Sequence, residues 1–166
     1  MEVAELASVD WSAPWLTPVA GLGRTVAASG DWRKSLNRLA AAANVCNSNS
    51  QRITFCEAGV ATEEPYETYI ARTGRVPTRA NLHDLFNALI FLRFPRAKAQ
   101  LNRLQAGSIA RDGVRAVRGP VRDAATLIDE NAVLVVTERS DMVKSLRGHD
   151  WWDLFQSRRF AWRGEV

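Results

Sequence analysis

The sequence of 166 residues is short of several residue types on which specialised folds depend. It has two cysteines, Cys46 and Cys56, and two histidines, with no CxxC pair, so neither a disulfide scaffold nor a zinc ribbon has the residues it requires. No apolar run approaches the roughly 18 residues of a membrane-spanning helix. The sequence therefore excludes these classes and leaves an ordinary globular protein.

The composition agrees with that class. Hydrophobic residues make up 46% and charged residues 24% of the chain, which is enough apolar surface for one buried core. The chain starts with the acidic residues Glu2 and Glu5, where a secretory signal would be basic, and no apolar segment follows. We therefore expect a cytoplasmic protein that is not bound to a membrane, with reduced cysteines.

Apolar residues at helical spacing, with caps, predict helices over residues 32–43, 65–73, 82–94, 95–106, 141–146 and 150–159. The best marked is 82–94, where Asn81 is expected to cap the N-terminus and Pro95 to end the helix and begin the next. Gly74 is expected in the left-handed position after 65–73, and Gly107 is expected to end 95–106.

A short strand is expected at residues 53–56, and the apolar runs 124–128 and 133–137 predict a β-hairpin, with the Asp129-Glu130-Asn131-Ala132 segment as its turn. The predicted fold class is thus α+β, mainly helical with a small antiparallel β-hairpin element. Residues 1–30 are expected to form an irregular N-terminal arm whose tryptophans dock on the core. Residues 31–166 are expected to form a single globular domain.

Short motifs spread over about residues 60–160 form a distinctive combination. They are Pro65-Tyr66-Glu67, the run from Gly74 to Leu89, Phe94-Pro95, Lys98, Leu101-Asn102, Arg122-Asp123-Ala124, Thr126 and Asp129-Glu130-Asn131. In this combination the chain resembles an uncharacterised bacterial family, domain of unknown function 3025. The resemblance implies a relationship and no particular activity.

Two departures from the family pattern affect the expectations. The resemblance implies a further strand after the tryptophan-rich helix, followed by a segment with a histidine and a glutamate, and the sequence stops at Val166 where that strand would begin. We therefore expect a domain that is C-terminally truncated. Ala132 also stands where the resemblance implies a glycine, which a tight hairpin turn favours.

One group of residues could carry catalysis. His83, Asp84 and Asn87 fall on one side of the 82–94 helix, where an imidazole, a carboxylate and an amide could act as base, metal ligand or substrate-positioning group. With Asp123 they form the hypothesis of a hydrolytic, metal-assisted enzyme. The alternative is structural: Asp84 completes the helix cap, and His83 and Asn87 bond to a neighbouring loop.

Arg75 and Arg79 precede the N-terminus of the same helix, where free amides and guanidinium groups favour an anion. Their alternative role is a salt bridge to Glu63, Glu64 or Glu67.

The second group is a basic stretch from Arg93 to Arg122, which carries eight basic residues and the single acid Asp112. Within it Lys98, Asn102, Arg111 and Arg122 could form an anion-binding wall, the alternative being a solvated helix face. The favoured function is a binding module that takes an anionic ligand or nucleic acid through this stretch. The hydrolytic enzyme is the alternative.

The aromatic residues near the C-terminus suggest self-association through Trp151, Trp152 and Phe155, or packing in a core. No nucleotide-binding loop, serine-hydrolase elbow or zinc-protease motif is found, so no cofactor is identified.

Overall fold

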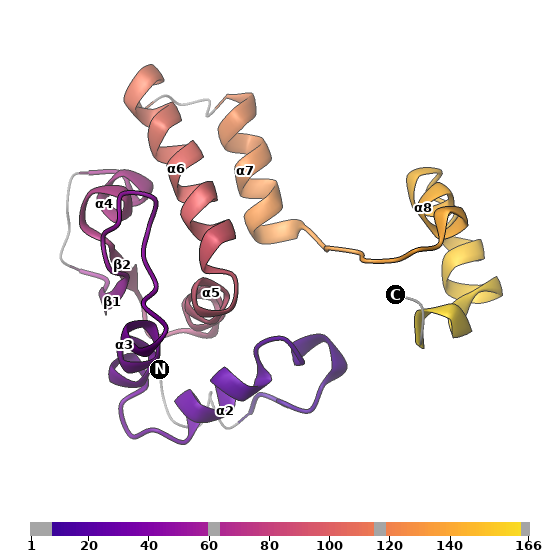
Figure 1. Ribbon diagram of the computed structural model, residues 1–166, viewed down its shortest axis with the longest axis horizontal. Helices are drawn as coiled ribbons and strands as arrows, with labels where there is room; N and C mark the ends of the chain where they lie inside the picture. The colour runs from indigo at the N-terminus through magenta and orange to yellow at the C-terminus, as the bar shows by residue number, and fades with distance from the viewer. Residues whose placement is uncertain (1–7, 60–63, 115–118, 164–166) are drawn as a thin grey trace. The chain divides into compact units, whose positions relative to one another are not determined.

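The computed structural model describes residues 8–59, 64–114 and 119–163 (Figure 1). The chain divides into two compact units, Met1–Glu130 and Asn131–Val166, called unit 1 and unit 2 below. The single domain expected over residues 31–166 stays a prediction. Within the described residues no helix is both long and apolar enough to cross a membrane.

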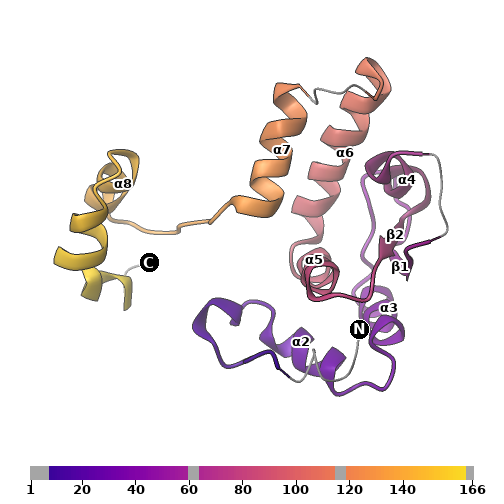
Figure 2. The ribbon, with the colours of Figure 1, turned by 180° about the vertical axis from the view of Figure 1, so that it is seen from behind.

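Unit 1 is built from helices and one small sheet. In chain order its elements are η1 Pro14–Leu16, α2 Ala20–Ala27, α3 Trp32–Ala42, β1 Thr54–Glu57, α4 Tyr66–Thr73, β2 Arg75–Thr78, α5 Leu82–Arg93, α6 Pro95–Asp112 and α7 Pro120–Asn131. α6 and α7 lie side by side in both views of the ribbon (Figures 1 and 2). The prediction of a mainly helical chain is confirmed.

The sheet consists of β1 and β2, which pair in parallel with Thr54 opposite Arg75 and Glu57 opposite Thr78. α4 makes the crossover that a parallel pair requires. β1 matches the strand expected at 53–56. β2 was not expected, because Pro77 lowers the strand propensity of its segment.

The antiparallel hairpin expected at 124–128 and 133–137 is wrong. Residues 120–131 form helix α7, and 132–137 have no regular secondary structure. Pro120 takes the first position of the helix, and Asp123 lies in its first turn, near the positive end of the helix dipole. A short apolar run fits a helix or a strand equally well, so these signals at the start of the helix decide the matter.

α5 forms as expected from its cap. The Asn81 side chain accepts a hydrogen bond of 2.8 Å from the backbone amide of Asp84, and the helix ends before Pro95, which begins α6. α6 continues to Asp112, so the expected end at Gly107 is wrong; a helix tolerates one glycine at a cost of about 1 kcal/mol.

Gly74 follows α4 with a φ of 69°, as expected. A Cβ there would lie 2.3 Å from the Arg52 carbonyl oxygen, so both the backbone conformation and the space require glycine.

The core of unit 1 lies among α2, α3, the sheet and α5, with Leu36, Ile70, Leu85 and Leu89 fully buried. Residues 20–27 form α2, so the expectation of an arm without regular structure is wrong there. Trp11 packs against this core, with its ring centroid 5.9 Å from that of Phe86.

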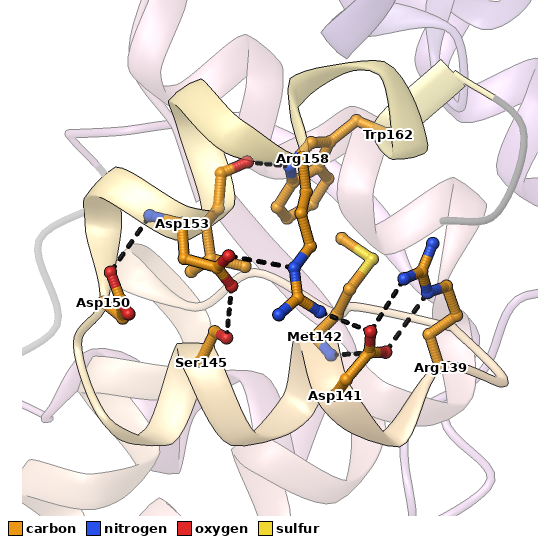
Figure 3. Close-up of polar contacts among 9 residues, drawn as sticks. Arg139, Asp141, Met142, Ser145, Asp150, Asp153, Arg158 and Trp162 are labelled. Carbon is orange, nitrogen blue, oxygen red and sulfur yellow. Dashed lines mark hydrogen bonds and ion pairs between the residues drawn. The ribbon is translucent and has the colours of Figure 1, made fainter.

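Unit 2 contains α8 Ser140–Arg147 and the short helical segments η2 Asp153–Ser157 and η3 Arg159–Arg163. Its buried apolar cluster is Met142, Leu154 and Ala161. Figure 3 shows a polar network beside this cluster, in which the Arg158 guanidinium lies between the carboxylates of Asp141 and Asp153.

The unit 2 network continues outward on both sides. Arg139 Nη2 donates to Asp141 at 2.7 Å, and Ser145 Oγ donates to Asp153 at 2.6 Å (Figure 3). Trp162 Nε1 donates to the Leu154 carbonyl at 2.8 Å. Charged hydrogen bonds therefore supply much of the cohesion that a larger apolar core would otherwise provide.

Candidate functional site

Asp84 is the centre of a compact charged group at the N-terminus of α5. Its carboxylate accepts hydrogen bonds from Arg79 Nε at 3.1 Å, Nη2 at 3.0 Å and the backbone amide at 2.7 Å. His83 Nδ1 lies 2.9 Å from Asp84 Oδ1. The carboxylate is therefore held on two sides. Arg79 forms a salt bridge, the alternative to anion binding, but its partner is Asp84 and not one of the glutamates considered.

These contacts fix the chemical state of the pair. Burial alone would raise the pKa of Asp84, but the hydrogen bonds from Arg79 and His83 outweigh burial and hold the pKa below its usual value. An ionised carboxylate only accepts, so Nδ1 of a neutral His83 carries the hydrogen and Nε2 keeps its lone pair. The side chain of His83 is 69% exposed, whereas that of Asp84 is 10% exposed.

A second polar group lies among α4, α5, α6 and α7. Lys98 on α6 is 5% exposed, and its ammonium donates to Asp129 Oδ1 at 2.6 Å, Asp129 Oδ2 at 2.8 Å and Asn87 Oδ1 at 2.8 Å. It also lies 4.6 Å from the centroid of the Phe91 ring. A buried lysine is costly unless its charge is paired, and Asp129 supplies the pair.

Glu67 and Asn102 extend this group. Asn102 Nδ2 donates to the Glu67 backbone carbonyl at 2.8 Å and to Glu67 Oε2 at 2.7 Å. Burial raises the pKa of Glu67, while Asn102, Lys98 and Arg122 lower it and Asp129 raises it, with burial the strongest influence. Arg122 on α7 therefore lies within electrostatic range of Glu67.

Tyr66 connects the two groups. Asn87 Nδ2 donates to the Tyr66 hydroxyl at a long 3.4 Å, and the hydroxyl lies within electrostatic range of Asp84, Asp129 and Arg79. Burial, with the nearby acidic groups, raises the pKa of Tyr66. The residue as a whole is 41% exposed, so the ring reaches solvent beside the polar groups.

The structure brings together most residues singled out in the sequence. His83, Asp84 and Asn87 lie on α5 as expected, and Lys98, Asn102 and Arg122 join the group of which Asn87 is a member. Lys98 is paired inside the chain instead of facing an external anion.

Three expected site residues lie elsewhere. Asp123 is exposed on α7 and, within the described part of the chain, shares no hydrogen bond or ion pair with His83. Arg75 is exposed on β2, and Arg111 is exposed near the end of α6. Their functional roles stay predictions.

Sequence reasoning missed Tyr66 and Glu67 and placed Asp129 in a turn. The signal for Asp129 was available: on a helix that begins at Pro120, it stands four residues after Ala125, the one buried residue of α7. Among the described residues no group of three or more histidine, cysteine, aspartate or glutamate side chains is arranged to hold a metal ion.

The basic residues of the stretch from Arg93 to Arg122 differ in their exposure to solvent. Lys98 is buried and Arg122 half-buried, whereas the exposed ones are Arg93, Arg96, Arg103 and Arg111. Arg115 and Arg118 lie outside the described residues. Arg96, Arg103 and Arg111 are seven and eight residues apart, so they share one face of α6 and are called the arginine row below.

The C-terminal aromatic residues lie mostly at the surface of unit 2. Trp151, Trp152 and Phe155 are exposed, and Phe155 stacks between Trp151 and Trp162 with ring centroids 6.2 and 5.6 Å apart. Self-association through these residues stays a prediction.

Comparison with known proteins places the chain in a family. A model of the family described as "Protein of unknown function (DUF3025)" matches residues 53–166, which is more than half of the chain and includes both polar groups described above. No curated protein and no solved structure matches significantly. The resemblance expected from the sequence motifs is therefore confirmed, and the chain belongs to the DUF3025 family.

Proposed function

We propose that this protein is a hydrolytic enzyme that uses His83 as a general base, with Asp84 orienting the imidazole. The observation that carries the proposal is the His83 Nδ1 to Asp84 Oδ1 contact of 2.9 Å, with the carboxylate buried and the imidazole exposed. This arrangement leaves Nε2 as the basic atom of an exposed ring. It is the relation between base and orienting carboxylate that hydrolytic sites use.

The chemistry follows from that geometry. Nε2 takes a proton from a water molecule, and the water oxygen attacks the acyl or phosphoryl centre of the substrate. Asp84 stabilises the imidazolium that forms, and the imidazolium then returns the proton to the leaving group as its bond breaks. Asp84 is already held by Arg79 and His83, so little reorganisation is required during the reaction.

The proposal uses Arg79 for substrate binding and does not use Asp123. The side chain of Arg79 is 66% exposed, and two of its nitrogens bond to Asp84. Its Nη1 donates no hydrogen bond within the described part of the chain, so it can donate to an anionic group of the substrate.

Substitution of the two histidines tests the proposal. The whole chain is assayed against chromogenic carboxylate esters, phosphate monoesters and phosphodiesters. His83→Ala should lower kcat/KM by at least about a hundredfold, the usual contribution of a general base, whereas His149→Ala should leave it unchanged. Equal rates for both variants, with melting curves like that of the native chain, would contradict the proposal, as would no hydrolysis of any of these substrates.

A second candidate function is binding of a polyanion, such as nucleic acid, along the arginine row. The observation that favours it is that three arginines share one exposed face of α6. Among the described residues Arg103 bonds to Gln100, at 3.1 Å, and forms no ion pair with an acid. Three guanidinium groups in a row match the repeated phosphates of a nucleic acid strand.

Salt dependence tests this second function. The triple variant Arg96→Glu, Arg103→Glu, Arg111→Glu should lose affinity for a single-stranded oligonucleotide and reduce the slope of log affinity against log salt by about 2. The variant Arg24→Glu, Arg38→Glu, which changes charge on α2 and α3, is the control. An unchanged slope in the triple variant would exclude the arginine row.

A further inference from the structure

The hydrogen bonds around Lys98 set the orientation of the Asn87 amide and, through it, the direction of the Tyr66 hydrogen. The Lys98 ammonium can only donate, and its contacts are with Asp129 Oδ1, Asp129 Oδ2 and Asn87 Oδ1. The carbonyl side of the Asn87 amide must therefore face Lys98. The NH₂ side then faces the Tyr66 hydroxyl, at 3.4 Å, so the network itself fixes the orientation of the amide.

The same reasoning sets the direction of the Tyr66 hydrogen. Because Asn87 donates to it, the Tyr66 oxygen acts as an acceptor on that side, and its own hydrogen must point elsewhere. Within the described residues the Tyr66 hydroxyl donates to no acceptor. The network therefore ends in an unused O–H donor on a side chain that reaches solvent.

The surroundings of this donor indicate what it binds. Tyr66 lies within electrostatic range of Arg79 and of three acids, Glu67, Asp84 and Asp129, of which Asp84 is paired with Arg79 and Asp129 with Lys98. Through Arg79 and Asp84 the donor belongs to the same region as His83. Burial raises the pKa of Tyr66, so the hydroxyl keeps its hydrogen over the physiological range. A second donor is Arg79 Nη1, which makes none of the hydrogen bonds of the described residues, on a guanidinium within electrostatic range of the Tyr66 hydroxyl. Two donors with no acceptor of their own fit an oxyanion.

We infer that the Tyr66 hydroxyl donates a hydrogen bond to an oxyanion of the substrate, a phosphate or carboxylate oxygen, and that Asp129, Lys98 and Asn87 are positioning residues that aim it. This inference rests on the proposed function, because it names the substrate class of the same site. It accounts for a buried lysine joined to an amide, an arrangement that the fold alone does not require.

The two tyrosines of the chain make a direct test possible. The chain is labelled with ¹³Cζ-tyrosine and titrated with inorganic phosphate and, separately, with acetate. Tyr66→Phe assigns the Tyr66 resonance, and Tyr69→Phe, at a buried tyrosine on the same helix, is the matched control. The Tyr66 resonance should move saturably with at least one anion, while the Tyr69 resonance should not.

Asn87→Asp tests the positioning role. A carboxylate at this position accepts from Lys98 and also from Tyr66, so the tyrosine hydrogen turns inward and is lost to the ligand. The anion affinity should fall about tenfold, the usual effect of one hydrogen bond to a charged group. Asn44→Asp, which makes the same change at an exposed position just after α3, should leave it unchanged.

Two results would overturn the inference: a Tyr66 resonance that neither anion moves, or equal affinities for the native chain and Asn87→Asp with both folded by their melting curves. These results are independent of the hydrolysis assay. A saturable Tyr66 response together with no effect of His83→Ala on hydrolysis would support the oxyanion site and contradict the hydrolytic function. The reverse pair of results would leave the hydrolytic function and remove the oxyanion donor.

Discussion

Unit 1 and unit 2 use polar side chains in opposite ways. Among the described residues, unit 1 buries a continuous cluster of fourteen apolar residues, whereas unit 2 buries a cluster of three. In unit 2 the charged network of Arg139, Asp141, Asp153 and Arg158 lies against that small core and connects its helical segments. In unit 1 the group around Lys98 adds a buried charge to a core that is already large.

This difference helps to separate structure from function. A charged network that replaces missing apolar contacts has a structural explanation, since a short segment cannot bury enough surface by itself. A buried ion pair beside a large core is a net cost or close to neutral, so stability does not account for it. This contrast favours unit 1, around Asp84 and Lys98, as the location of the proposed site.

Core truncation should give the largest effects and the clearest contrast. Leu89→Ala should lower the free energy of unfolding of unit 1 by about 2–5 kcal/mol, because Leu89 is fully buried. Leu154→Ala should abolish the fold of unit 2, whose buried cluster over residues 131–163 otherwise consists of Met142 and Ala161, and leave the main melting transition in place. Circular dichroism follows the main transition, and the indole NH signal of Trp162 follows unit 2.

If Leu154→Ala lowered the main transition as much as Leu89→Ala does, the two units would share one cooperative core. The contrast between them would then be wrong.

A pair of glycines on α2 tests how the N-terminal segment contributes to unit 1. A Cβ on Gly23 would lie 2.0 Å from the Trp11 ring, whereas a Cβ on Gly21 would meet nothing within 4 Å. Gly23→Ala should therefore cost about 1–3 kcal/mol by displacing Trp11. Gly21→Ala should stabilise by about 0.5–1 kcal/mol through helix propensity. Chemical denaturation measures both, and equal effects would show that Trp11 does not dock firmly.

Glu67 and Asp141 should make the stability of their two units respond to pH in opposite directions. Burial raises the pKa of Glu67 above its ordinary value of 4.5, so its contribution to unit 1 is present below 4.5 and is lost as the pH rises through the folded pKa. Hydrogen bonding from Arg139 lowers the pKa of Asp141 to about 2 from 3.8, so its contribution to unit 2 is present above 3.8 and is lost as the pH falls toward 2.

Melting curves recorded between pH 7 and pH 2 check this difference. From pH 7 to pH 5 the native chain should gain stability relative to Glu67→Gln. Below pH 4 the Trp162 signal of unit 2 should disappear in the native chain, and it should change less with pH in Asp141→Asn. The pKa of Asp84 is also lowered, so its contribution to the stability of unit 1 is lost in the same acid range as that of Asp141. That range lies below the pH 7 to pH 5 interval used to test Glu67. The same pH response from both variants would contradict the assignment.

Local signals predicted much of the fold. The cap at Asn81, the corner at Pro95 and the left-handed Gly74 are decided by nearby residues, and the structure confirms all three. The apolar run 124–128 before Asp129 does not determine its own secondary structure, because the spacing and length of its apolar residues fit either a helix or a strand. The parallel pairing of β1 with β2 depends on the packing of α4, which no local pattern specifies.

The candidate site was predictable to the same extent. His83, Asp84 and Asn87 were found because helical spacing places them on one element. The contact of Lys98 with Asp129 joins positions 31 residues apart and requires α7 to be a helix, so the hairpin interpretation concealed it. Tyr66 was not singled out as a site residue, because its proposed role depends on the amide orientation that Lys98 imposes on Asn87.

The tautomer of His83 tests the central claim most directly. The chain contains two histidines, so a long-range ¹H–¹⁵N spectrum of histidine-labelled protein resolves both, and His149→Ala assigns them. Neutral His83 should carry its hydrogen on Nδ1, bonded to Asp84, with Nε2 unprotonated, and Asp84→Asn should remove this preference. A neutral His83 protonated on Nε2 in the native chain would contradict the oriented base and, with it, the proposed hydrolytic site.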